Sequence, residues 1–324
     1  MRNYVASLVV LAGLIMLMSC APSRQEGTAA GLYKDAEAKA IAFESYDKVM
    51  ELWPVEFEED WVETEYGTTH IIVSGPDGAK PVFFIPGSYA DATMWYPNVE
   101  VLAEQYRVYS LDLIVFGGKS EPSTKPVSGV DDYVAWFSAL KDHYGYSTVS
   151  VAGLSYGSWL SLTLAREIPD SISVVVLLDP AGSFAEMDGG MAWRGLWTFA
   201  LFQNRAKYAR FYNWMGGDYS GPQAEIMIEH LLDVTEYGSV SVFEIPQPGI
   251  YSPEELTMVT MPVLVMASGK PILYKNPREF AAAAARALPH AEIEIVPGAG
   301  HFLNAEKADQ VNARMIRFFS ENYR

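Results

Sequence analysis

A serine between two glycines is the first feature of the sequence that could do chemistry. Ser155 lies in the pentapeptide Gly153-Leu154-Ser155-Tyr156-Gly157, after the strand-forming run of residues 148–152 and before the helix-forming run of residues 159–165. This order predicts a strand, a sharp turn and a helix, with the serine at the turn. Glycines on both sides let strand and helix pass close together. The pattern is typical of a nucleophilic serine, and a serine that only caps the helix is the alternative.

A serine hydroxyl is a weak nucleophile at neutral pH and needs a base within hydrogen-bonding distance. His301 is the best candidate among the five histidines, because it lies in a glycine-rich loop after the last predicted strand. We expect this loop at the end of the sheet where Ser155 emerges. Structural or solvated roles are expected for the other four, which are His70, His143, His230 and His290.

Attack of a serine on an acyl carbon creates an oxyanion, which needs two preorganised hydrogen-bond donors. The backbone amide of Tyr156, directly after the serine, is one expected donor. The loop of residues 85–89 follows an early predicted strand, and it nominates the amide of Ser88 as the other. Alternatively, Gly87 in this loop only turns the chain. These groups require neither a metal nor another cofactor, and none is expected.

The elements that must position these residues alternate along the chain. Apolar strands are predicted over residues 69–73, 81–85, 107–111, 149–152, 173–178, 262–266 and 291–296. Helices are predicted over residues 34–52, 130–143, 159–168, 277–288 and 311–319. Strands that are apolar throughout and separated by helices indicate an α/β fold with a mostly parallel sheet covered on both faces.

The alternation stops after Gly182 and resumes near residue 259. Residues 183–258 are rich in aromatic side chains on predicted helices, and we predict that they form a helical cap inserted between two strands. Ordinary helical core is the alternative, and a cap can serve in part as both. The core domain then comprises residues 32–182 and 259–324.

The N-terminus predicts an export signal, because a charged start and an apolar run over residues 5–18 precede Cys20. The apolar run is too short to cross a bilayer. We expect residues 1–19 to be a lipoprotein signal peptide, Cys20 to carry lipid, and residues 20–31 to be a tether. The protein would then be anchored in the cell envelope, facing the periplasm or the cell exterior. A soluble secreted protein is the alternative.

The composition narrows the possible partners. The chain has 324 residues and a single cysteine, so disulfide bonds within the mature chain are not expected. The formal net charge of −17 disfavours binding to nucleic acid and attraction to anionic lipid headgroups.

Taken in order, these motifs resemble the α/β-hydrolase superfamily, and within it a bacterial branch of capped serine hydrolases of esterase type. The resemblance covers nearly all of the chain after the tether. It rests on the Pro86-Gly87 loop, Asp112 after a strand, Gly118-Lys119-Ser120, the turn at Ser155, Asp179-Pro180-Ala181-Gly182 and the Gly-His loop. It implies an α/β-hydrolase fold and hydrolysis of a carboxylic ester or a related acyl bond. The aromatic cap favours an apolar group in a small-molecule substrate.

The sequence departs from the superfamily pattern at two places. Pro86 stands where a histidine usually braces the loop, and residues 267–274, where the acid of the catalytic triad usually lies, contain no carboxylate. Some members of the superfamily take their acid from the end of the strand after the nucleophile, and the resemblance therefore offers Asp179. This residue orients the base or, alternatively, caps the turn at Pro180.

Two further carboxylates are expected to have structural roles. Asp112 resembles a structural aspartate of the fold, and Glu306 follows His301 closely enough to brace its loop. Because the usual acid is missing, a second hypothesis stays open: a catalytically inactive, hydrolase-fold binding lipoprotein of the bacterial envelope.

Overall fold

The computed structural model describes residues 31–200, 203–241 and 244–323 of the chain. The predicted signal peptide and Cys20 lie outside these residues, so the structure does not test either of them. In the described part, no helix combines the length and the apolar character needed to span a bilayer.

A nine-stranded sheet forms the centre of the molecule, with the strand order β1-β2-β4-β3-β6-β7-β8-β9 and β5 added beside β2. Strands β1, β2 and β4 pair antiparallel, whereas β4-β3-β6-β7-β8-β9 are parallel throughout. The strands span Phe57–Thr64 (β1), Gly67–Ser74 (β2), Lys80–Ile85 (β3), Tyr106–Leu111 (β4), Glu121–Pro122 (β5), Val149–Leu154 (β6), Ile172–Leu178 (β7), Val263–Ser268 (β8) and Glu292–Val296 (β9). The predicted mostly parallel sheet is confirmed.

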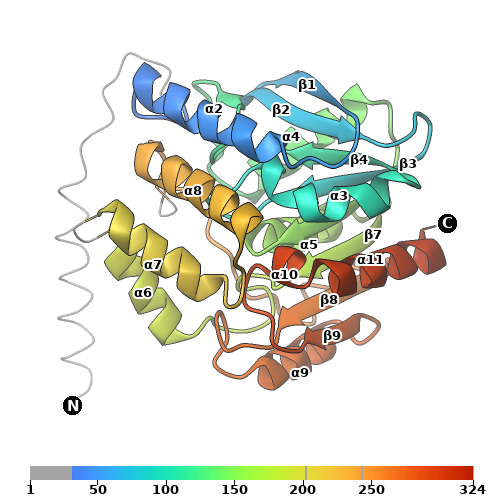
Figure 1. The fold of residues 1–324 in the computed structure, drawn as a ribbon. Helices are drawn as coiled ribbons and strands as arrows, with labels where there is room; N and C mark the ends of the chain where they lie inside the picture. The colour runs from blue at the N-terminus through green and yellow to red at the C-terminus, as the bar shows by residue number, and fades with distance from the viewer. Residues whose placement is uncertain (1–30, 201–202, 242–243, 324) are drawn as a thin grey trace.

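Helices cover both faces of the sheet. Figure 1 shows α3 (Tyr96–Ala103) and α11 (Ala308–Asn322) in front of the sheet, and α4 (Val130–His143) and α5 (Tyr156–Glu167) behind it. Successive β3 side chains enter different cores, because Phe83 packs with α4 and α5 residues whereas Phe84 packs with α3 and α11 residues. Both faces are therefore buried, which explains why the central strands are apolar throughout.

Three helices lie between β7 and β8, where the alternation of the sequence stops. They are α6 (Gly189–Phe199), α7 (Arg205–Met215) and α8 (Pro222–Tyr237), and Figure 1 shows them beside the sheet. Helix α8 packs against α7 and against the N-terminal helix α2 (Ala36–Met50). The chain thus leaves the sheet after β7, builds a helical segment outside it, and returns through β8.

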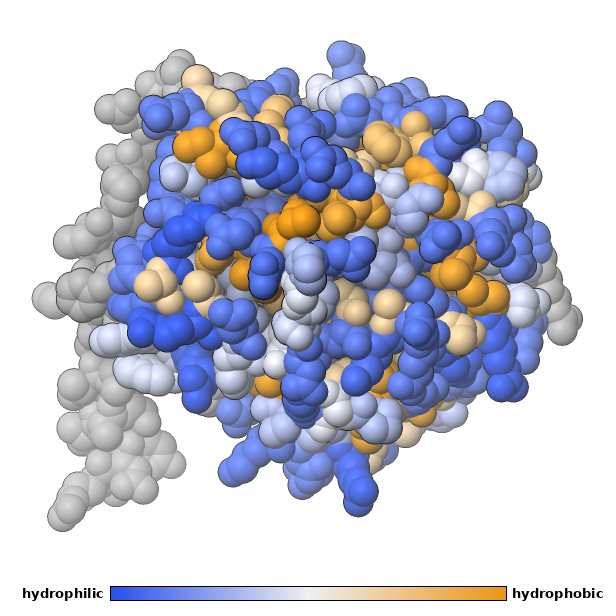
Figure 2. All heavy atoms as spheres, viewed as in Figure 1, coloured by the Kyte–Doolittle hydropathy of each residue, from blue (hydrophilic) through white to orange (hydrophobic). Residues whose placement is uncertain are grey.

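The remaining elements are short or peripheral: η1 (Ala92–Trp95), η2 (Pro169–Ser171), α9 (Pro277–Ala287) and α10 (Leu303–Glu306). Most atoms on the face drawn in Figure 2 belong to hydrophilic residues, with hydrophobic residues scattered among them. This surface agrees with the high net charge of the chain.

Candidate active site

Ser155 occupies a tight turn between β6 and α5, as the sequence predicts. Its backbone has φ 57° and ψ −115°, a conformation that residues other than glycine rarely adopt. A Cβ added to Gly153 would stand 2.2 Å from the carbonyl carbon of Gly157, and one added to Gly157 would stand 2.1 Å from the oxygen of Ile85. Both glycines are therefore required, because β6, α5 and the end of β3 approach too closely for any side chain.

Backbone strain gathers at this end of the sheet. Among the described residues, positive φ angles outside glycine occur at Tyr89, Ser155, Asp179 and Ser183. Ser155 and Asp179 directly follow β6 and β7, and Tyr89 lies in the loop after β3. Such residues cost about 1–3 kcal/mol each and are frequent at functional sites.

His301 and Asp179 form a close, buried pair. The Nδ1 atom of His301 lies 2.6 Å from Oδ2 of Asp179, and the Ser268 amide donates to Oδ1 at 2.9 Å. His301 is 2% exposed and Asp179 is 0% exposed. Because an ionised carboxylate only accepts hydrogen bonds, Nδ1 carries the proton and Nε2 is left as an acceptor. Both oxygens of Asp179 thus bind groups other than the turn at Pro180.

The loop that carries His301 is fixed from two sides. The His301 amide donates to the carbonyl of Met215 at the end of α7, 2.8 Å away. The Glu306 carboxylate accepts from the amides of Gly300, at 2.8 Å, and Asp218, at 3.2 Å. Burial raises the pKa of Glu306. Glu306 therefore lies where a brace for this loop was expected, and it also ties the loop to the segment after α7.

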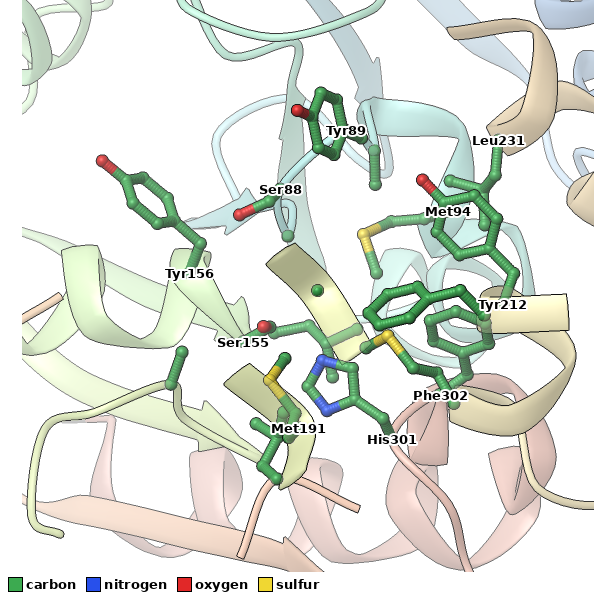
Figure 3. A pocket seen from close by; sticks show the side chains of 18 of the residues that line it. Ser88, Tyr89, Met94, Ser155, Tyr156, Met191, Tyr212, Leu231, His301 and Phe302 are labelled. Carbon is green, nitrogen blue, oxygen red and sulfur yellow. The ribbon is translucent and has the colours of Figure 1, made fainter. Parts of the chain in front are cut away.

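The two residues expected to supply the oxyanion donors line the same pocket as Ser155. Ser88, Ser155, Tyr156 and His301 all line this pocket, and Figure 3 shows their side chains around it. A Cβ added to Gly87 would stand 3.5 Å from the Cβ of Ser155, which places the loop after β3 beside the serine. In the part of the chain that the structure describes, neither the Ser88 amide nor the Tyr156 amide donates to a protein acceptor. Both amides can therefore serve a substrate oxygen.

Asp112, directly after β4, binds the loop that follows β3. The resemblance to the hydrolase superfamily implies a structural aspartate at this position. Its carboxylate accepts from the amides of Ala92, at 2.8 Å, and Lys119, at 2.7 Å, and it lies 2.7 Å from Nδ1 of His70. These contacts support the loop that has Pro86 in place of the usual histidine.

Besides His301–Asp179 and His70–Asp112, the structure has a third buried histidine–carboxylate pair that the sequence does not predict. Nε2 of His230, on α8, lies 2.6 Å from Oδ2 of Asp91, and its Nδ1 lies 2.8 Å from the Ser45 hydroxyl of α2. All three side chains are buried and none lines the pocket. Burial disfavours ionisation of Asp91, but His230 and two hydrogen bonds from Thr93 hold its pKa below the ordinary value.

The pocket around Ser155 has a volume of about 300 Å³. Its described lining contains no Asp, Glu, Lys or Arg and includes several methionines and aromatic residues, some of them labelled in Figure 3. The Tyr156 hydroxyl donates to the carbonyl of Pro246. The Tyr219 hydroxyl forms a hydrogen bond with the Tyr96 hydroxyl. The polar groups near the serine are thus largely occupied, and the surface open to a ligand is apolar. Within the described ranges, no three His, Cys, Asp or Glu side chains are grouped to hold a metal ion.

A mostly parallel sheet with a strained serine directly after one of its central strands is typical of one class of protein. Residues 82–314 match the model of the alpha/beta hydrolase family, and the chain belongs to this family.

Within this family the chain is similar to carboxylesterases of Bacillus subtilis (strain 168). Carboxylesterase YbfK is 29% identical over 280 residues, which cover 85% of this chain and 92% of the relative. A protein described as uncharacterized carboxylesterase nap is 27% identical over 290 residues, covering 86% of this chain and 92% of the relative. The crystal structure of naproxen esterase (carboxylesterase NP) from Bacillus subtilis matches with a TM-score of 0.80 at 27% identity, covering 88% of this chain and 99% of that chain.

Proposed function

We propose that the protein is a serine hydrolase that cleaves a carboxylic ester through an acyl-enzyme, with Ser155 as nucleophile, His301 as base and Asp179 as the acid that orients the base. The observation that carries this proposal is the 2.6 Å contact between His301 Nδ1 and Asp179 Oδ2, because His301 lines the same pocket as Ser155. The carboxylesterase relatives support the reaction class.

In the proposed reaction, each of these groups has one role. Nε2 of His301 takes the proton of the Ser155 hydroxyl as Oγ bonds to the acyl carbon, and the amides of Ser88 and Tyr156 hold the oxyanion. The imidazolium, stabilised by Asp179, then protonates the leaving alcohol, and an ester of Ser155 remains. Water attacks that ester and gives a proton to His301. As the bond between Oγ and the acyl carbon breaks, His301 returns the proton to Oγ, which releases the carboxylic acid and restores the free serine.

The pocket supports an apolar, uncharged substrate group, because no charged side chain of Asp, Glu, Lys or Arg is available in its described lining to pair with a charged one. Residues 183–258 act as a cap in this proposal, because Met191 and Phe199 of α6 and Phe211 of α7 line the pocket.

We also propose that the chain is exported and carries lipid at Cys20, with residues 20–31 as tether. The support is in the sequence, where a charged start and a short apolar run precede the single cysteine. This would place the hydrolase at a membrane surface of the cell envelope.

Hydrolysis of neutral p-nitrophenyl esters by the full chain tests the proposed activity. We expect turnover by the native protein and a loss of about 10⁶-fold in kcat for Ser155→Ala, as for the nucleophile of a triad enzyme. Ser123→Ala, at an exposed serine, is the matched control and should keep native turnover. Equal turnover in Ser155→Ala and the native protein would refute the proposal.

A further inference from the structure

Helix α6 exposes two tryptophans to solvent on the side away from the pocket. Trp193 is 62% exposed and Trp197 is 46% exposed, and their spacing of one helical turn places them on the same face. Other residues of the helix, including Met191, Leu196 and Phe199, line the pocket that contains Ser155. The helix thus has an apolar face inward and an aromatic face outward, which a helix that meets only water on its outer side does not need.

The segment that carries these tryptophans is basic, whereas the whole protein is acidic. Residues 189–215 contain Arg194, Arg205, Lys207 and Arg210 and neither Asp nor Glu, in a chain with a net charge of −17. Arg205 is neutralised by carboxylates of α8. Among the described residues, no ion pair joins Arg194 or Arg210 to an acidic side chain, and both are exposed.

The basic groups lie next to the aromatic ones. The guanidinium of Arg194 is 4.9 Å from the ring centre of Trp214, and the ammonium of Lys207 is 4.4 Å from that of Trp197. Tryptophan with an adjacent cation suits the boundary between lipid headgroups and acyl chains, where the ring is partly buried and the cation meets phosphate. The local charge governs contact at this range, because salt screens the more distant negative charge of the protein beyond about 8 Å.

The first described residues of the chain and the first residue of α7 both contact the C-terminal end of α8. The Lys34 amide donates to the carbonyl of Tyr237 at 3.0 Å, and the Ser239 amide donates to that of Leu32 at 2.9 Å. Arg205, the first residue of α7, pairs with Glu236 one residue before Tyr237. Residues 32–34 therefore lie beside the start of α7, on the side of the molecule that carries α6 and α7 in Figure 1.

We propose that the α6–α7 surface, defined by Trp193, Arg194, Trp197, Lys207 and Arg210, docks on an anionic phospholipid bilayer. The tryptophans enter the headgroup region, the basic side chains contact phosphate, and α6 then lies between the bilayer and the pocket. The surface acts in addition to any lipid at Cys20, which would hold the chain near a membrane without orienting it.

Quenching of tryptophan fluorescence by brominated lipid tests this docking with the full chain on phosphatidylglycerol vesicles. The Ser155→Ala background removes hydrolysis, so the result does not depend on the proposed activity. We expect quenching that is lost in Trp193→Ser/Trp197→Ser. The matched control is Trp61→Ser on β1, a residue 49% exposed, and it should keep the quenching. Equal quenching in the double variant and the control would overturn the proposal.

A second variant tests whether docking requires the basic side chains of the α6–α7 surface. Arg194→Gln/Arg210→Gln should lower the ratio of docked to undocked protein on phosphatidylglycerol by about 30-fold, and have little effect on phosphatidylcholine. Arg317→Gln on α11, with a side chain 72% exposed, is the control and should dock like the native chain.

A second copy of the chain is the other partner that could cover the α6–α7 surface. Tryptophan shielding that depends on protein concentration without vesicles would show that interface and contradict docking on lipid.

Discussion

At the scale of single residues, the nucleophile and the base could be predicted from the sequence, whereas the acid could not be fixed. Ser155 and His301 each lie in a short motif with a clear position relative to predicted strands. Asp179 shares its sequence signal with an aspartate that caps a turn. It lies 2.6 Å from His301 because β7, β8 and β9 are neighbours in the sheet. The position of Asp179 next to His301 thus depends on strand pairing, which the local sequence around Asp179 does not specify.

Asp179→Asn tests the role of this carboxylate. An amide cannot stabilise the imidazolium and favours the wrong tautomer of His301, so we expect kcat to fall by about 10⁴-fold while KM changes little. Circular dichroism should show an unchanged fold. Activity within a few-fold of native would mean that another group orients the base.

At the scale of elements, the central strands and the covering helices follow the prediction closely because their apolar patterns are strong. Helix α4 begins and ends at the predicted residues, and β3, β6 and β7 differ by at most two residues at either end. Strand β1 was not predicted, because Val62 is its one buried residue and its sequence is mostly acidic and polar. It forms because β2 offers a partner edge, which is a tertiary effect.

The close packing of the turn at Ser155 makes Gly157→Ala a sensitive variant. The added methyl group would stand 2.1 Å from the carbonyl oxygen of Ile85, so α5 must move away from β3. We expect a loss of about 1–3 kcal/mol in the free energy of unfolding and a large loss of activity, measured by urea titration and ester turnover. Gly189→Ala, which meets no atom within 4 Å, should leave stability nearly unchanged. Native stability in Gly157→Ala would contradict the packing.

At the scale of the whole molecule, side chains distant in sequence connect the sheet domain to the helices between β7 and β8. Asp91 and His230 are 139 residues apart and meet only because α8 folds back over the loop after β3. The sequence contains both residues but no signal for their pairing. The same loop carries Ser88, so the position of α8 and the geometry of the active site depend on each other.

The Asp91–His230 pair predicts a specific acid sensitivity. The folded protein holds the pKa of Asp91 below its ordinary value. The contribution of the ionised Asp91 carboxylate to the free energy of unfolding is therefore complete above about pH 4, and it is lost as the pH falls through the lowered pKa. We expect Asp91→Asn to lose about 3–5 kcal/mol at pH 7 and to show a flatter fall in unfolding free energy below pH 4 than the native chain. Asp77→Asn, at a side chain 93% exposed, is the control for general charge effects. A native slope in Asp91→Asn would refute the assignment.

Reaction of the folded full chain with a fluorophosphonate, followed by peptide mass mapping, tests the central claim most directly. Attack by an activated serine oxygen on phosphorus expels fluoride and leaves a stable covalent adduct. We predict one adduct, on Ser155, that is absent in Ser155→Ala and forms orders of magnitude more slowly in His301→Ala. A folded native chain that gains no adduct, or gains it on another serine, would contradict the assignment of Ser155 as the nucleophile activated by His301.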